Sequence, residues 1–137
     1  MTIKIPQQIV TEMIEHSKSL APIEACGYLA GKDQAVTKRF EMTNIDNSPE
    51  HFTFDPKEQF QAVKQARQDG LELNCVYHSH PASPARLSQE DIRLFNDPKM
   101  IYIIVSLHDG LEDVKAFMVN KPDDQTVEIK KVEIEVS

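Results

Sequence analysis

Apolar residues recur at helical spacing in two long segments of the chain. The first segment, residues 7–20, follows Pro6 and carries its apolar residues on one face: Ile9, Val10, Met13, Ile14 and Leu20. The second segment, residues 56–70, has Asp55 as a capping residue, a proline in its first turn and Gly70 as a stop. Its expected buried stripe is Phe60, Ala62, Val63 and Ala66. We predict a helix in each segment.

Strand-like patterns occupy most of the remaining chain. Residues 100–107 are almost entirely apolar, as expected of a central strand with both faces covered. Asp33-Gln34 is predicted to turn the chain between two paired strands, and a short strand is expected at Phe52 to Phe54. The other predicted strands cover residues 3–5, 23–32, 35–44, 71–77, 114–120 and 126–136.

This order of elements predicts an α/β fold. A chain of 137 residues is long enough for one hydrophobic core and too short for two. We therefore expect a single domain over residues 1–137, arranged as three layers in which helices flank a mixed, curved central sheet.

Composition and charge exclude some classes of function. Apolar residues make up 40% and charged residues 27%, close to the globular average, which argues against disorder. The net charge of −7 is spread without a basic cluster, so we expect neither nucleic acid nor an anionic membrane as a partner. No apolar run is long enough to span a bilayer and the N-terminus lacks a signal-peptide core, so we expect a cytoplasmic protein.

Two cysteines, Cys26 and Cys75, match neither a CxxC redox motif nor a cysteine-rich zinc site. Buried free thiols are the expected state. Strand alternation places Cys75 on the face opposite to His78, whereas Cys26 shares the face of Glu24 if that segment is extended. Only Cys26 is a candidate neighbour of a site.

The candidate chemistry lies in the segment HSHPASPARLSQED, which runs from His78 to Asp91. His78 and His80 are two positions apart at the end of a predicted strand, so both imidazoles point to the same face. Ser88 and Asp91 are three apart where a helix begins, so they share one side of its first turn. Two imidazoles and one carboxylate suit zinc when a fourth position is left for water.

Each of these residues also has a plainer explanation. Histidines at a strand end are often only hydrogen-bonded, while Ser88 and Asp91 could be a helix cap and a charge that favours the helix dipole. Glu24 could be a surface residue before a strand. All these explanations would have to hold together by coincidence. The other histidines have no partner at ligand spacing and are expected on the surface or in turns: His16, His51 and His108.

Together these residues match a known pattern. The sequence resembles the JAMM, or MPN-plus, family of zinc metallopeptidases, whose signature is an upstream glutamate followed by His-x-His-x7-Ser-x2-Asp. Every position of the signature is filled, by Glu24, His78, His80, Ser88 and Asp91. The resemblance covers most of the chain and implies the MPN fold, which is cytidine-deaminase-like. Deaminase chemistry itself would need HxE and PCxxC motifs, which are absent.

The resemblance implies a role for each residue of the signature. His78, His80 and Asp91 would bind one catalytic zinc per chain, and Glu24 would hold the zinc-bound water and move its proton. Ser88 would stabilise the reacting oxygen of the substrate.

The resemblance also indicates a class of substrate. The family includes isopeptidases of ubiquitin conjugates, and its short prokaryotic members look suited to ubiquitin-like or sulfur-carrier proteins that end in Gly-Gly. The segment between Asp91 and Ile101 is short, so we expect an open site and a small ubiquitin-fold or sulfur-carrier partner. Two alternatives stay open: a zinc hydrolase of short peptides or small amides, and a non-catalytic MPN scaffold.

Overall fold

The computed structural model describes residues 1–137, which form three α-helices, seven β-strands and one short 3-10 turn. The helices are α1 (Gln7–Leu20), α2 (Pro56–Gln68) and α3 (Gln89–Leu94). The strands are β1 (Thr2–Ile5), β2 (Cys26–Lys32), β3 (Ala35–Met42), β4 (Glu72–His80), β5 (Ile101–Ser106), β6 (Asp113–Asp123) and β7 (Thr126–Val136). The helices and long strands predicted from the sequence are therefore present, with ends shifted by a few residues.

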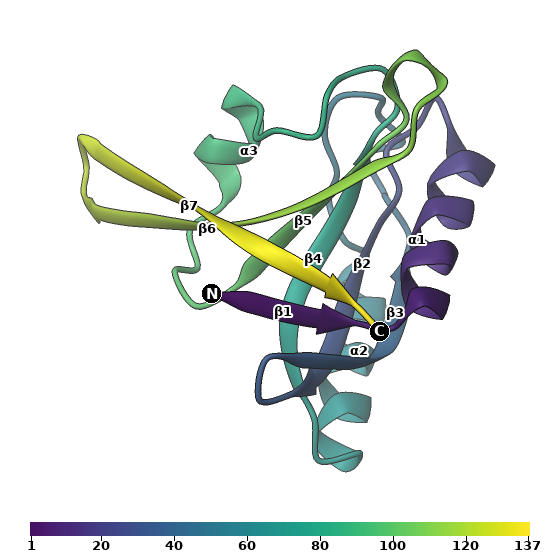
Figure 1. The fold of residues 1–137 in the computed structure, drawn as a ribbon, viewed down its shortest axis with the longest axis vertical. Coiled ribbons are helices and arrows are strands. Elements are labelled where there is room, and N and C mark those ends of the chain that lie inside the picture. The colour runs from purple at the N-terminus through teal and green to yellow at the C-terminus, as the bar shows by residue number, and fades with distance from the viewer.

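The sheet is mixed and closes on itself. Its strand order is β1-β3-β2-β4-β5-β6-β7, and β1 also pairs with β7. The β1–β3, β1–β7 and β4–β5 pairs are parallel, and the others are antiparallel. In Figure 1, β1 crosses in front of the curved sheet and lies beside the end of β7.

The α/β class and the mixed, curved sheet agree with the prediction from the sequence. A three-layer arrangement describes the molecule only in part, because β1 joins β7 to β3 and turns the expected open sheet into a barrel. Closure depends on four register pairs between β1 and β7 and on a single pair, Lys4 with Ala35, between β1 and β3.

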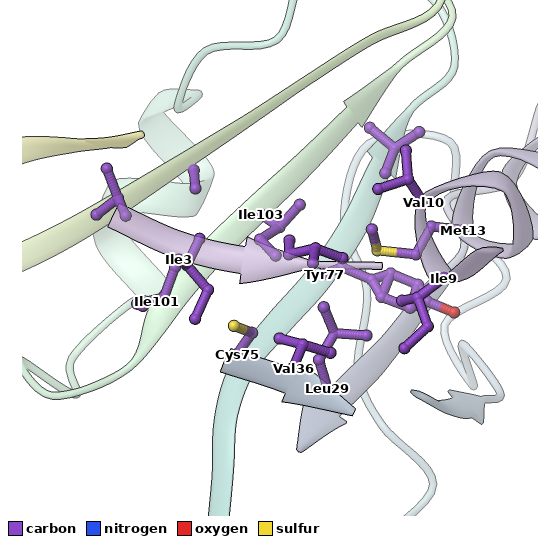
Figure 2. Close-up of a cluster of buried hydrophobic side chains, with 14 residues drawn as sticks. Ile3, Ile9, Val10, Met13, Leu29, Val36, Cys75, Tyr77, Ile101 and Ile103 are labelled. Carbon is purple, nitrogen blue, oxygen red and sulfur yellow. The ribbon is translucent and has the colours of Figure 1, made fainter. Parts of the chain in front are cut away.

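Two hydrophobic clusters cover the two faces of the sheet. All seven strands and α1 contribute to the inner cluster of 14 buried residues (Figure 2), which includes Cys75 and Tyr77 of β4. The outer cluster of eight buried residues contains Val76 of β4 and Ala62 of α2. Successive side chains of β4 thus enter opposite cores, as expected of a central strand.

Two details of the prediction were wrong. The stripe expected on α2 is only half buried: Ala62 and Ala66 pack inward, whereas Phe60 is 70% exposed and Val63 is 38% exposed. The strand expected at residues 52–54 is reduced to one β-bridge between Phe54 and Asn44. The segment before α2 is a loop, and Phe52 and Phe54 of that loop pack against the outer cluster.

No helix combines the length and the apolar character that a membrane span requires.

Candidate metal centre

Strand β4 carries the two histidines of the candidate site. β4 lies between β2 and β5, and His78 pairs in register with Cys26 on one side and Ile104 on the other. His78 is completely buried and His80 is 3% exposed. Because they are two positions apart in one strand, their rings project from the same face, as the sequence predicts.

Asp91 reaches the same point from the first turn of α3. Ser88 caps this helix with a reciprocal pair of hydrogen bonds: the Asp91 amide donates to Ser88 Oγ, and the Ser88 amide donates to Asp91 Oδ2, each over 3.0 Å. This capping box fixes the Asp91 side chain against the backbone. Its carboxylate is therefore held in one orientation although the helix is short.

The three side chains bring their donor atoms together. His78 Nε2 lies 3.1 Å from His80 Nε2 and 3.1 Å from Asp91 Oδ1, and His80 Nε2 lies 3.0 Å from Asp91 Oδ2. One ligand atom from each residue lies within 4.8 Å of the others. Donors that bind one tetrahedral cation at about 2.0–2.2 Å lie about 3.3–3.6 Å apart, so these three atoms are a few tenths of an ångström closer together than ligands of one small cation.

The surroundings of His80 determine which of its ring nitrogens is free. His80 Nδ1 lies 3.0 Å from the carbonyl oxygen of Pro84, which can only accept a hydrogen bond. The ring proton is therefore on Nδ1, and Nε2 presents a lone pair towards His78 and Asp91. A carbonyl in this position is the usual support of a metal-binding histidine. The donor set thus fits a divalent cation.

Packing holds the ring of His78. Phe52 stacks on it with ring centroids 4.9 Å apart, and Phe95 meets it edge-on at 5.6 Å. His78 Nδ1 is buried and makes no hydrogen bond within the protein. The orientation of this ring is thus set by the two phenylalanines and by its position in β4.

The charges in the site favour an anionic Asp91 and a neutral His78. Burial alone would raise the pKa of Asp91, but its close polar contacts with His78 and His80 and the hydrogen bond from the Ser88 amide outweigh burial and lower the pKa below the usual 3.8. Burial lowers the pKa of His78 below 6.5 despite the opposing charge of Asp91. Neutral imidazole and ionised carboxylate are the forms that bind metal.

Glu24 lies beside this cluster in the segment that leads into β2. It is 3% exposed, and its atom Oε1 is buried without a hydrogen-bond partner. Burial, together with the smaller effects of the nearby charges of Asp91 and Glu50, raises the pKa of its carboxyl to about 9. A buried carboxyl with a raised pKa next to a ligand cluster has the properties of a general base.

Ser79 connects Glu24 to the strand of the histidines. Ser79 lies between His78 and His80, its Oγ accepts a hydrogen bond from the Ala25 amide at 2.7 Å, and its amide donates to the Ala25 carbonyl at 3.0 Å. These two bonds extend the β2–β4 ladder to the residue next to Glu24. The structure thus places all five residues singled out from the sequence at one end of β4.

Some contributors to the site were not identified from the sequence. Phe95 has no distinguishing signal in an apolar helix end, and Phe52 was predicted only as part of a short strand. The Pro84 carbonyl is a backbone group, so residue types could not reveal it. Cys26 is buried beside His78 across the β2–β4 pair, and Cys75 is buried in the inner cluster, so both thiols are free and buried as predicted.

The expectation for the other histidines was wrong for His16. His51 is partly exposed in a loop and His108 is partly exposed in the 3-10 turn, as predicted, but His16 is buried on α1 and its Nδ1 lies 2.7 Å from the Tyr77 hydroxyl. The apolar residues around His16 predicted the buried face of α1, but His16 itself, as a polar residue, was predicted to be exposed.

Comparison with known proteins gives consistent matches over most of the chain. Desampylase from Pyrococcus furiosus is 34% identical over 105 residues, which cover 77% of this chain and 74% of that protein. CysO-cysteine peptidase from Mycobacterium tuberculosis (strain H37Rv) is 36% identical over 108 residues, which cover 77% of this chain and 73% of the peptidase. The solution structure of a Desulfitobacterium hafniense protein superposes with a TM-score of 0.82 at 36% identity and covers 100% of this chain and 94% of its own.

A family model described as prokaryotic homologs of the JAB domain matches residues 6–120. The matched range contains every residue of the candidate centre and all three helices, while residues 1–5 and 121–137 lie outside it. The chain therefore belongs to the family of prokaryotic homologs of the JAB domain.

Proposed function

We propose that this protein is a zinc-dependent peptidase that cleaves the amide bond following the Gly-Gly tail of a ubiquitin-like or sulfur-carrier protein. The relatives named desampylase and CysO-cysteine peptidase support this class of substrate. The observation that carries the proposal is the convergence of two imidazole nitrogens and one carboxylate beside a buried, unpaired glutamate carboxyl.

Zinc fits the donor set of His78, His80 and Asp91 and leaves coordination positions for reactants. When bound, zinc would polarise the scissile carbonyl and make water acidic enough to attack it near neutral pH. The protein's part is to hold the three donor atoms at fixed positions. The Pro84 carbonyl does so for His80, the two phenylalanines for His78 and the capping box for Asp91.

Glu24 is the proposed general base. Its Oε1 makes no hydrogen bond in the protein, so it is free to take the proton of the attacking water and to pass it to the leaving amine. A nearby cation would favour the ionised carboxylate that this role needs, against the burial that raises the pKa of Glu24.

Ser88 is the proposed donor to the oxyanion. Its Oγ accepts the Asp91 amide, and its own hydroxyl proton has no acceptor within the protein. That proton is available for the carbonyl oxygen of a substrate as negative charge develops there. One hydroxyl therefore caps α3 through its oxygen and would assist the reaction through its hydrogen.

An apolar cavity beside the centre gives the substrate tail a place to bind. It has a volume of about 390 Å³ and continues from the rings of Phe52 and Phe95, which also contact His78. A tail ending in two glycines can approach the buried donors closely, because glycine has no side chain. An apolar residue further back in the tail would then fill the cavity. Its other lining residues are Tyr28, Thr53, Phe54, Gln59, Val76, Leu94, Asp97, Met100 and Tyr102.

Cleavage of carrier proteins tests the proposed substrate. The zinc-loaded protein is incubated with candidate carriers that bear a peptide extension after Gly-Gly, and the products are read by intact mass. We expect a product that ends at Gly-Gly, and loss of the reaction in Glu24→Gln with zinc retained, because the amide cannot accept the proton. Cleavage by Glu24→Gln at the wild-type rate would show that Glu24 is not the base. Hydrolysis of short peptides without cleavage of any carrier would instead support the small-substrate alternative.

Metal content tests the ligand set separately. We expect about one zinc per chain in the wild type and its loss in Asp91→Ala, because two imidazoles alone hold zinc weakly. Glu90→Ala is the matched control, since Glu90 precedes Asp91 on α3 but pairs with Arg93 at the surface. Elemental analysis after dialysis against a weak chelator gives the stoichiometry. Full zinc retention by Asp91→Ala would refute the assignment.

A further inference from the structure

Asn44 organises the loop that connects β3 to α2. Its side chain is 7% exposed and makes four hydrogen bonds. Nδ2 donates to the carbonyl oxygens of Glu24 and His51, both at 3.0 Å, while Oδ1 accepts from the amides of Asp46 at 3.1 Å and Thr53 at 3.2 Å. Both atoms of the carboxamide are thus hydrogen-bonded. Its orientation is determined, because backbone carbonyl oxygens only accept and backbone N–H groups only donate hydrogen bonds.

The backbone of Glu24 is held by this loop on both sides of the residue. The Glu24 amide donates to the Ser48 carbonyl at 2.9 Å, and the Glu24 carbonyl accepts from Asn44 Nδ2. On the following residue, the Ala25 amide is fixed to Ser79 Oγ. Glu24 therefore sits between the loop and β4, and three hydrogen bonds determine the path of its main chain.

The carboxyl of Glu24 has no comparable support. Its Oε1 is buried without a partner, and none of the side-chain hydrogen bonds in the protein involves either of its oxygens. The direction in which the carboxyl points is consequently set by its backbone. A shift of the Glu24 carbonyl would move the carboxyl with it.

Asn44 also holds the residue that precedes Phe52. Its second Nδ2 bond fixes the carbonyl of His51, and the next residue, Phe52, stacks on the ring of His78. One buried amide thus links the candidate base to the aromatic side chain that covers a candidate ligand.

We propose that Asn44 is a positioning residue that sets the place of the Glu24 carboxyl relative to the metal centre. This inference rests on the proposed function, in which Glu24 is the base. Asn44 contacts neither substrate nor metal and acts through the Glu24 carbonyl. Asparagine suits the position because two donors and two acceptors are needed at one buried point, and aspartate offers only acceptors.

The test removes the donor while keeping the shape. Asn44→Asp can retain both acceptor bonds and loses both donor bonds, to the carbonyls of Glu24 and His51. Asn44→Ser, which is too short to reach Glu24, serves as a second variant should the charge prevent folding. For either variant we expect zinc content to stay at the wild-type level and kcat for carrier cleavage to fall roughly 10- to 100-fold, with a smaller change in KM, because a small misplacement of a reacting group costs this much.

A mutant cycle separates positioning from a general loss of order. In the Glu24→Gln background the same substitution should change the residual single-turnover rate by less than about twofold, because the group that Asn44 positions is already disabled. An equal loss in both backgrounds would overturn the inference. Thr43→Val is the matched control: it removes the bond from Thr43 Oγ1 to Glu58 at the start of the same loop and should leave kcat unchanged.

A measurement without substrate keeps this inference distinct from the proposed function. Hydrogen exchange at the Glu24 amide reports its bond to Ser48, so exchange should be faster in Asn44→Asp and unchanged in Thr43→Val. If the wild type cleaves no carrier but this exchange difference is found, the proposed function fails and the positioning of Glu24 stands. Unchanged exchange together with unchanged kcat would refute the role of Asn44.

Discussion

At the scale of single residues, His16 shows how a buried titratable group can be held neutral away from the metal centre. Arg39 Nη1 donates to the Tyr77 hydroxyl oxygen at 3.0 Å, so the Tyr77 proton is directed to His16 Nδ1, 2.7 Å away. Burial lowers the pKa of His16 below 6.5, against an opposing effect of Glu41 and with a smaller lowering effect of Arg39. Protonation of Nδ1 would break the bond with Tyr77.

This arrangement predicts an acid sensitivity of folding. A lowered pKa in the folded state means that the unfolded chain binds the proton more readily, so stability is complete above pH 6.5 and declines as the pH falls below it. In His16→Gln, the side-chain oxygen can still accept a hydrogen bond from Tyr77. The free energy of unfolding of this variant should fall between pH 7.5 and 5.5 by about 1 kcal/mol less than that of the wild type. Urea unfolding at pH 7.5 and 5.5, with any metal removed by a chelator, measures this difference. An identical decline in the wild type and in His16→Gln would contradict a neutral, buried His16.

At the scale of elements, α2 and α3 both begin with a side-chain cap, but the two caps have different roles. Asp55 caps α2 by accepting the Lys57 amide at 2.9 Å, and Ser88 caps α3 by accepting the Asp91 amide. The cap of α2 only completes a helix, whereas the cap of α3 also orients a candidate ligand and carries the proposed donor to the oxyanion.

The two caps therefore provide a matched pair of substitutions. Asp55→Ala and Ser88→Ala should each lower the free energy of unfolding by about 1 kcal/mol, the usual cost of a lost cap. Only Ser88→Ala should also lower kcat, by roughly 10²-fold or more, as found for other lost oxyanion donors. Thermal melts and carrier cleavage give the two readouts. An equal kcat in both variants would leave Ser88 as a cap alone.

The sequence predicted elements better than it predicted what lies between them. Periodicity located the helices and long strands, because burial of one face imposes a local pattern. It failed on the segment from Asn44 to Phe54, where order comes from the hydrogen bonds of one asparagine, and a polar residue in a turn gives no sign of that role. It also overestimated the apolar face of α2, since Phe60 has the helical spacing of a core residue but no facing element.

The candidate site was accessible to sequence reasoning for a different reason. Metal ligands must be of a few residue types at spacings that strand and helix geometry permit, so His78, His80 and Asp91 form a specific sequence pattern. The groups that orient them form no such pattern, because every residue type has a backbone carbonyl like that of Pro84.

At the scale of the whole molecule, closure of the sheet ties stability to β1, far from the centre. Ile3 and Ile5 are fully buried in the inner cluster, where Figure 2 shows Ile3 on β1 facing Ile101 and Ile103. No short-range pattern indicates that a four-residue strand completes a barrel. The pairing of β1 with β7 joins opposite ends of the sequence, which is why closure could not be predicted.

This placement predicts stability effects without catalytic ones. Ile5→Ala should lower the free energy of unfolding by roughly 2–4 kcal/mol, because it leaves a cavity in the closed core. Ile129→Ala on β7 should change it by less than about 0.5 kcal/mol, since Ile129 is 47% exposed. Both folded variants should retain zinc, because neither residue contacts the centre. Chemical denaturation and metal analysis check these values, and zinc loss from folded Ile5→Ala would show that the barrel supports the centre directly.

The closure also constrains how the chain can fold while it is being synthesised. β1 is synthesised well before its main partner β7, which lies about 130 positions later in the chain. A nascent chain that already contains Glu24, His78 and Asp91 therefore still carries the apolar residues of β1 without the strand that will cover them. Synthesis of β7 allows the sheet to close, so a ribosome that stalls before β7 would leave unpaired strand edges that promote aggregation.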